Sequence, residues 1–146
     1  MATFTPLRYP GGKGKMGPFL ADFLKINDLD GGTYVEPYAG GAGAALYLLL
    51  HGHVKRLILN DIDPAVFSFW NSVLNETERF AKYVEHVPLT IAEWEAQKKV
   101  HRSAGSGFEL GFAFFYLNRT NRSGIMNEGG YRGSGTEGEM GNGCPV

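Results

Sequence analysis

The sequence predicts an α/β protein built around a parallel β-sheet. Two apolar stretches with strand character, residues 33–37 and 54–59, lie on either side of a glycine-rich turn and a strongly apolar helical segment that ends before Gly52. This order is a βαβ unit, in which the two strands lie parallel and helices cover the sheet. The length of 146 residues and the 43% hydrophobic content suit a single domain with one core.

The elements before the second strand follow from local signals. Residues 6–17 are rich in glycine and proline, so we expect a loop, and the apolar spacing of residues 19–24 then predicts a short helix. Gly31 and Gly32 predict a turn. The first strand begins at Thr33 and is ended by Pro37, because proline cannot donate a hydrogen bond to a neighbouring strand.

The second half of the chain reads as mainly helical. Asp63 is predicted to cap a helix that starts at Pro64, and this helix carries apolar residues at helical spacing. Two more helices are expected over residues 91–101 and 108–117. Residues 126–146 repeat glycine and contain few large apolar side chains, so they predict a flexible tail. Aromatic residues of these helices are assigned to the core, namely Phe69, Trp70, Phe112, Phe114 and Phe115.

Composition limits the classes of function. The formal net charge of −1 gives no overall sign of nucleic-acid binding, although a local basic patch would suffice. Cations gather near the two ends, at Arg8, Lys13, Lys15 and Lys25 and at Arg119, Arg122 and Arg132, and ordinary solvated charge explains each of them equally well.

Location and metal binding are also constrained by the sequence. A single cysteine, Cys144, excludes an internal disulfide and a thiolate metal site, and no histidine has a partner at metal-ligand spacing. The first residues have no signal-peptide pattern, and the longest apolar run, residues 44–50, is too short to span a bilayer. We therefore expect a cytoplasmic protein with no membrane segment and no metal.

The first strand–helix turn has the features of a nucleotide-type cofactor site. Gly40, Gly41 and Gly43 allow the backbone to approach a ligand closely, and the following helix offers unpaired N–H donors at its start. Asp61 follows the next strand, where an acid can bind a ribose diol. The alternative is an acid that caps the next helix, a role for which Asp63 is better placed.

The chemistry of the turn favours a cationic cofactor. A dinucleotide motif would need a third glycine where Leu46 stands, and no glycine precedes Gly12-Lys13 at the P-loop spacing. Glu36, directly after the strand, would repel a pyrophosphate but can pair with a cation. S-adenosylmethionine, which carries a sulfonium and an α-ammonium, therefore fits better than a dinucleotide.

Four segments in order resemble the Dam-like (D12 class) adenine-N6-specific DNA methyltransferases, in particular their amino-terminal part. They are PLRYPGGK at residues 6–13, VEPYAGGAGA at 35–44, LNDIDPAVFSFWN at 59–71 and FFYLNRTNRSGI at 114–125. The resemblance implies a Rossmann-like, S-adenosylmethionine-dependent methyltransferase fold and double-stranded DNA as the partner. It divides the chain into a cofactor-binding part, residues 1–117, and the start of a target-recognition region that runs into the tail, residues 118–146.

The resemblance also implies roles for individual residues. Tyr9 would pack on the cofactor, Lys13 would pair with its carboxylate, and Asp61 would hold its ribose. The full set of cofactor-binding candidates is Tyr9, Gly12, Lys13, Glu36, Pro37, Tyr38, Gly40, Gly41, Gly43, Asp61 and Ile62. A loop over residues 118–125 would face DNA, and the candidates there and near the start are Arg8, Asn118, Arg119, Arg122, Ser123 and Ile125. For Arg122, a plain surface arginine is the competing interpretation.

One motif of the family is absent from this sequence. The family receives a flipped-out adenine in a [D/N/S]-P-P-[Y/F/W] loop, and these 146 residues contain no Pro-Pro pair. Because that loop follows the recognition region, we expect a domain that is incomplete and inactive as this chain alone. The alternatives are a non-catalytic module that binds S-adenosylmethionine or DNA, or one subunit of a split enzyme. An open sheet edge predicts a homodimer, a second chain or marginal stability.

Overall fold

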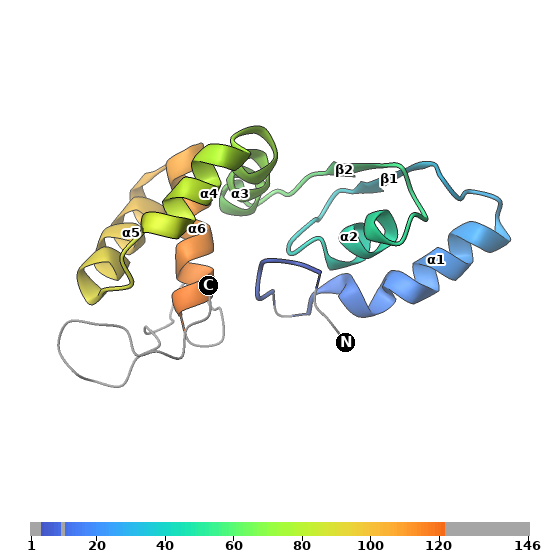
Figure 1. The fold of residues 1–146 in the computed structure, drawn as a ribbon, viewed down its shortest axis with the longest axis horizontal. Helices are drawn as coiled ribbons and strands as arrows, with labels where there is room; N and C mark the ends of the chain where they lie inside the picture. Colours follow the sequence, from blue (N-terminus) through green and yellow to red (C-terminus); the bar gives the residue numbers. More distant parts are fainter. Residues whose placement is uncertain (1–3, 10, 122–146) are drawn as a thin grey trace. The chain divides into compact units, whose positions relative to one another are not determined.

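The computed structural model describes residues 4–9 and 11–121, which belong to two compact units, Met1–Ile62 and Asp63–Val146 (Figure 1). The first unit is mixed α/β, and the described part of the second is helical. The predicted division after residue 117 falls inside a helix and does not coincide with the border between these units.

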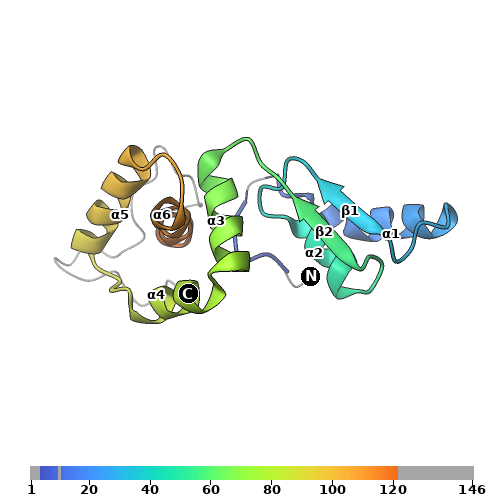
Figure 2. The same cartoon turned by 90° about the horizontal axis from the view of Figure 1, so that it is seen from above.

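The amino-terminal unit contains the predicted βαβ arrangement. Its elements are the 3-10 helix η1 (Lys13–Met16), α1 (Gly17–Ile26), β1 (Thr33–Glu36), α2 (Gly43–Leu50) and β2 (Arg56–Leu59). The strands pair in parallel, with Val35 opposite Ile58, which confirms the prediction. Figures 1 and 2 show α1 and α2 on the same face of the sheet. Residues 13–16, expected to be loop, form η1 instead, so a short helical turn leads directly into α1.

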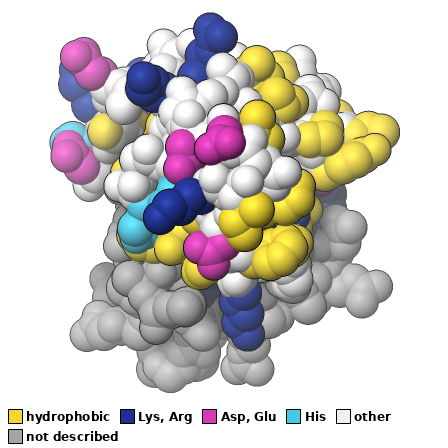
Figure 3. Space-filling view, turned by 90° about the vertical axis from the view of Figure 1, so that its right-hand side faces the viewer, with side chains coloured by type: hydrophobic (Ala, Val, Ile, Leu, Met, Phe, Trp, Pro, Cys, Tyr) yellow, Lys and Arg dark blue, Asp and Glu magenta, His cyan; other side chains and the backbone are white. Residues whose placement is uncertain are grey.

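Only one face of the two-stranded sheet is covered within this unit. Ala21, Leu48 and Val54 form its buried core between the helices and that face. On the other face Val35 and Ile58 remain 54% and 49% exposed. Three further large apolar side chains are exposed on α1, namely Phe19, Phe23 and Ile26. Figure 3 shows hydrophobic side chains gathered at the surface of this end of the molecule.

The carboxy-terminal unit is built from α3 (Pro64–Asn75), α4 (Thr77–His86), α5 (Ile91–Ser103) and α6 (Phe108–Thr120). The predicted start of α3 is confirmed, because Asp63 Oδ1 accepts a hydrogen bond of 2.9 Å from the Ala65 N–H and Pro64 occupies the first turn. Helix α4 was not predicted from the sequence. Its buried residue Phe80 contacts Phe69 and Phe112 edge-on.

Helices α3 and α6 pack closely because α6 carries a glycine at the contact. A Cβ added to Gly111 would lie 2.5 Å from the Ser68 carbonyl oxygen, well inside van der Waals distance. Phe69 and Phe112 are buried around this contact. The assignment of these aromatic residues to the core is therefore confirmed, as it is for Trp70 and Phe114.

Helix α5 packs beside α6 and is held at both ends. The Trp94 indole N–H donates a buried hydrogen bond of 2.7 Å to Asn121 Oδ1. Near the other end, the His101 ring stacks on Phe114. Burial lowers the pKa of His101, while Asp63 opposes this effect and Arg102 adds to it. These contacts tie the two helices together along their length.

The first residues of the expected DNA-facing loop are helical. Residues 118–120 form the last turn of α6, and Asn118 is only 2% exposed. The helical hydrogen bonding continues through Thr120, whose hydroxyl donates to the Tyr116 carbonyl. Three DNA-binding candidates, Arg122, Ser123 and Ile125, lie outside the described residues, as does the predicted tail, residues 126–146.

Two kinds of feature are absent from the described ranges, residues 4–9 and 11–121. No helix there is long and apolar enough to cross a membrane. The same residues hold no group of three or more His, Cys, Asp or Glu side chains arranged to bind a metal ion.

Candidate functional site

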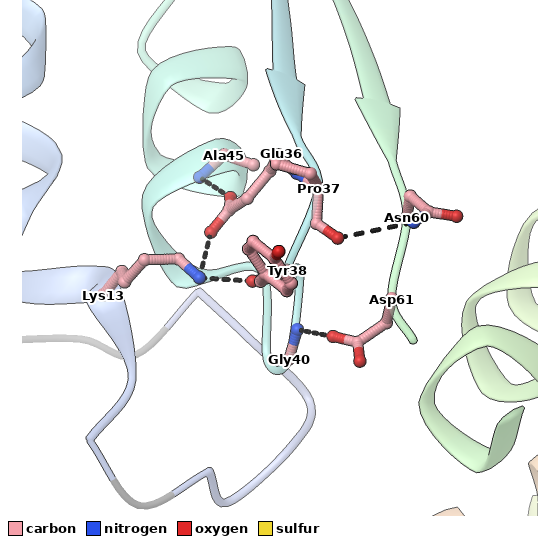
Figure 4. Close-up of polar contacts among 8 residues, drawn as sticks. All are labelled: Lys13, Glu36, Pro37, Tyr38, Gly40, Ala45, Asn60 and Asp61. Atoms are coloured by element: carbon pink, nitrogen blue, oxygen red, sulfur yellow. Dashed lines mark hydrogen bonds and ion pairs between the residues drawn. The ribbon is translucent and has the colours of Figure 1, made fainter. Parts of the chain in front are cut away.

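Hydrogen bonds beyond the ends of β1 and β2 place Asp61 beside the glycine turn. The Asn60 N–H donates to the Glu36 carbonyl at 3.0 Å, and the Ala39 N–H donates to the Asn60 carbonyl at 2.9 Å. This pairing brings the Asp61 carboxylate to the turn, where Oδ2 accepts a hydrogen bond of 2.8 Å from the Gly40 N–H (Figure 4). The turn lies at the carboxyl edge of a parallel sheet, where α/β proteins bind ligands.

Glu36 places a buried negative charge under the same turn. It ends β1, is 3% exposed, and accepts a hydrogen bond of 3.2 Å from the Ala45 N–H in the first turn of α2. An anion is favourable there because the first N–H groups of a helix lack backbone partners. Burial and the Glu36 carboxylate together raise the pKa of the Tyr34 phenol, so the negative potential extends along the strand.

Lys13 supplies the positive charge of the site. Its Nζ lies 2.9 Å from Glu36 Oε1 and also donates to the Tyr38 carbonyl (Figure 4). The Lys13 side chain is 38% exposed, whereas the carboxylate is almost fully buried. Within the described residues, Oε1 accepts no hydrogen bond in addition to this ion pair. The ammonium can therefore reach solvent or a ligand while the carboxylate stays in place.

The glycines of the turn are required by close contacts with the amino-terminal segment. Gly40 has a φ of +49°, and a Cβ there would lie 2.9 Å from the Tyr9 ring. A Cβ on Gly43 would lie 3.0 Å from the backbone of Gly14, at the start of η1. Tyr9 and η1 thus cover the turn, because the glycines have no side chains to hold them off.

The structure brings together most of the predicted cofactor residues, although with contacts the sequence did not suggest. Two sets of polar contacts meet at this turn: Lys13 with Glu36 and the Tyr38 carbonyl, and Gly40 with Asp61. Tyr9, Gly41 and Gly43 pack against the same turn, with Gly41 next to the Tyr9 side chain. The Pro37 carbonyl accepts from the Asn60 side chain at 3.4 Å. Gly12 is exposed before η1, and Ile62 is 84% exposed at the end of this unit.

This arrangement can hold a small ligand with charges of both signs. A carboxylate on the ligand could pair with Lys13, a cation could pair with Glu36, and a pair of hydroxyl groups could donate to Asp61. Gly40 and Gly41 let the Tyr9 side chain pack directly on the turn. Of the ligands considered from the sequence, S-adenosylmethionine matches this set of groups.

Comparison with models of protein families gives a match for this chain. The family model for the D12 class N6 adenine-specific DNA methyltransferase matches residues 9–133, which is most of the chain. The chain belongs to this family. Comparison with individual curated proteins gives no match.

Membership of the D12 class implies a methyltransferase fold for this chain. D12 class enzymes use S-adenosylmethionine and act on adenine in DNA. The matched region begins at Tyr9 and includes the complete glycine turn and Asp61. It therefore contains both sets of polar contacts at this turn.

Sequence reasoning missed two contacts of this candidate site. Lys13 pairs with Glu36, 23 positions away, and Asp61 is bonded to Gly40, 21 positions away. Opposite charges on Lys13 and Glu36 were visible in the sequence, but no local pattern shows that their elements meet. The hydrogen bond from the Ala45 N–H to Glu36 could have been anticipated, because an acid near the start of a helix often accepts a hydrogen bond from the first turn of that helix.

Proposed function

We propose that this chain binds S-adenosylmethionine at the turn formed by residues 39–43 and serves methyl transfer to adenine N6 in double-stranded DNA. The observation that carries the proposal is the convergence of Lys13, Glu36 and Asp61 on one glycine turn at the carboxyl edge of a parallel sheet. Membership of the D12 class supplies the reaction. The charges and hydrogen-bonding groups of these three residues support this turn as the place where the cofactor binds.

Each charged residue has a distinct task in this proposal. Lys13 pairs with the cofactor carboxylate and keeps its distance from the positively charged sulfur. Glu36 stays buried and balances the cation, and its Oε1, which is ion-paired with Lys13 and accepts no further hydrogen bond among the described residues, can accept a donor from the ligand. Asp61 turns from the Gly40 N–H to the ribose hydroxyls, or accepts both through its two oxygens.

Tyr9 and the glycine turn define the shape of the cofactor site. The Tyr9 ring is 42% exposed, so it packs on the turn and still presents a surface to a ligand. S-adenosylmethionine supplies an electrophilic methyl group when it is bound. The residues of this chain hold and orient the cofactor and exclude water from one side of it.

The sequence suggests that this chain binds the cofactor without completing the transfer. Adenine N6 is a weak nucleophile, because its lone pair is delocalised into the ring, and the family polarises it in the Pro-Pro loop. These 146 residues have no Pro-Pro pair. We propose that another stretch of polypeptide, covalently joined or separate, provides this loop.

Calorimetric titration with S-adenosylmethionine tests the binding proposal. We expect micromolar affinity for the unchanged chain, about −8 kcal/mol. Asp61→Asn keeps an oxygen for the Gly40 N–H but removes the charge that strengthens bonds to the ribose. Because such charged hydrogen bonds contribute roughly 1.5–3 kcal/mol, we expect affinity to fall by about 10- to 100-fold.

The matched control is Asp63→Asn, the same change two residues later. Asparagine caps helices as well as aspartate does, so α3 and cofactor affinity should both be unaffected. Equal affinity in the Asp61→Asn and unchanged chains would contradict the ribose role. Absence of binding by the unchanged chain would contradict the cofactor proposal. Radiolabelled methyl transfer to duplex DNA by this chain alone would contradict the need for a separate loop.

A further inference from the structure

The last two turns of α5 carry a concentration of positive charge outside the cofactor site. Lys98, Lys99 and Arg102 lie within five residues, whereas the acidic residues of α5, Glu93 and Glu95, belong to its first half. Lys99 and Arg102 are three residues apart and therefore share one face of the helix, and both are exposed. The carboxyl end of α5 is thus a small basic surface.

The exposed cations of this surface form no ion pair within the part of the chain that the structure describes. Arg79, on α4, is bonded to two carboxylates, Glu76 at 2.7 Å and Glu109 at 3.0 Å. Lys98 lies over the Trp94 ring, 4.4 Å from its centre. By contrast, Lys99 and Arg102 have no ion-pair partner among residues 4–9 and 11–121. Their charges are available to a partner.

The surroundings of these two side chains would let an extended anion approach. The loop that follows α5, Ala104 to Gly107, has small residues, and a Cβ on Gly105 would meet nothing within 4 Å. A helix carboxyl end favours cations by itself. This effect of the helix end does not by itself explain why two exposed cations lie beside an open loop of small residues.

We propose that Lys99 and Arg102 bind phosphates of double-stranded DNA. This inference rests on the proposed function, which makes DNA the substrate, and it adds a contact outside the segment that resembles the family's recognition region. Toward the other end of α5, Trp94 is bonded to Asn121, which belongs to that segment. The eight helical steps from Trp94 to Arg102 span about 12 Å. Duplex DNA presents about seven phosphate charges over that length, so one duplex can reach both ends.

The test is the salt dependence of binding to a short fluorescent DNA duplex, measured by anisotropy. The variant is Lys99→Gln with Arg102→Gln. The control is Lys55→Gln with Lys82→Gln, which removes the same charge at two other exposed positions. Each lost phosphate contact lowers the slope of log affinity against log salt by about 0.9. For two contacts, the unchanged chain should lose about 12-fold more affinity than the variant between about 50 and about 200 mM salt.

The outcomes separate this inference from the proposed function. A reduced slope in the Lys99/Arg102 variant and an unchanged slope in the control would support the phosphate contacts. Equal reductions in both would overturn them, because net charge alone would then explain the effect. DNA binding that neither variant alters would also overturn the proposed phosphate contacts. A chain that binds S-adenosylmethionine but no DNA overturns this inference alone, and a chain that binds neither overturns the proposed function as well.

Discussion

Replacing Gly40 by alanine should disturb the candidate cofactor site in two separable ways. The first is backbone strain, because Gly40 has a φ of +49° and a residue with a Cβ is about 1–2 kcal/mol less stable there. Alanine also restricts the unfolded chain, which offsets roughly 0.4–1 kcal/mol of this cost. The second is steric, because the new Cβ would lie 2.9 Å from the Tyr9 ring.

The structure contains a matched control for the backbone term. Gly52 has a φ of +76° in the same unit, and a Cβ there would meet nothing within 4 Å. Gly52→Ala should therefore cost only the strain, a net destabilisation of about 0.5–1 kcal/mol. At Gly40 the Tyr9 ring must retreat by roughly 0.6–1 Å to reach ordinary contact distance. Because Tyr9 is half exposed, we expect the low end of overpacking costs, about 1 kcal/mol more.

Thermal unfolding and cofactor titration distinguish the two substitutions. The extra 1 kcal/mol should lower the melting temperature of Gly40→Ala by about 4 °C relative to Gly52→Ala. A displaced Tyr9 ring loses its packing on the cofactor, so affinity for S-adenosylmethionine should fall about fivefold, the equivalent of an aromatic contact of roughly 1 kcal/mol. Gly52→Ala should bind normally. Identical melting temperatures and affinities in the two variants would refute the reasoning.

Three further predictions concern the carboxy-terminal unit. Gly111→Ala should destabilise the protein by about 1–3 kcal/mol in urea, despite alanine's helix propensity, because its Cβ overlaps the α3 backbone, whereas Gly105→Ala should be neutral or slightly stabilising. Burial lowers the pKa of His101 below 6.5, so the unfolded chain binds more protons. Stability should therefore decline as pH falls from about 6.5 through the lowered pKa, and His101→Gln should lose that component. Trp94→Phe removes a buried hydrogen bond to Asn121 and should cost about 1–2 kcal/mol, measured by chemical denaturation.

Local signals predicted the elements that frame the cofactor site. The two strands and the glycine turn each have short-range signatures, and the Asp63-Pro64 pair marks the start of α3 correctly. Helix α4 was missed, although Phe80, Tyr83 and Val84 have helical spacing, because the segment is mostly polar. The end of α6 was placed too early, since Asn118 and Thr120 are polar and yet buried in its last turn.

Contacts between distant residues could not be predicted in the same way. The sequence supplied the candidates Lys13, Glu36 and Asp61, but their pairing depends on how η1 packs against the turn. That packing is possible because Gly14 and Gly43 approach closely, and nothing in the sequence near either glycine indicates the other. The roles of these residues toward a cofactor stay predictions, which the Asp61 and Gly40 variants test.

The exposed face of the sheet bears on whether this chain acts alone. Val35 and Ile58 face away from α2, and Phe19 and Phe23 are exposed on α1, so the unit that holds the cofactor site buries only part of its apolar surface. A two-stranded sheet also leaves an unpaired edge on each strand, and both edges can pair with further strands. The predicted partner, whether a second copy or another polypeptide, would cover this face without blocking the glycine turn, which lies at the carboxyl end of the strands. Partner binding and cofactor binding by this chain are therefore compatible, and both can be measured on the same preparation.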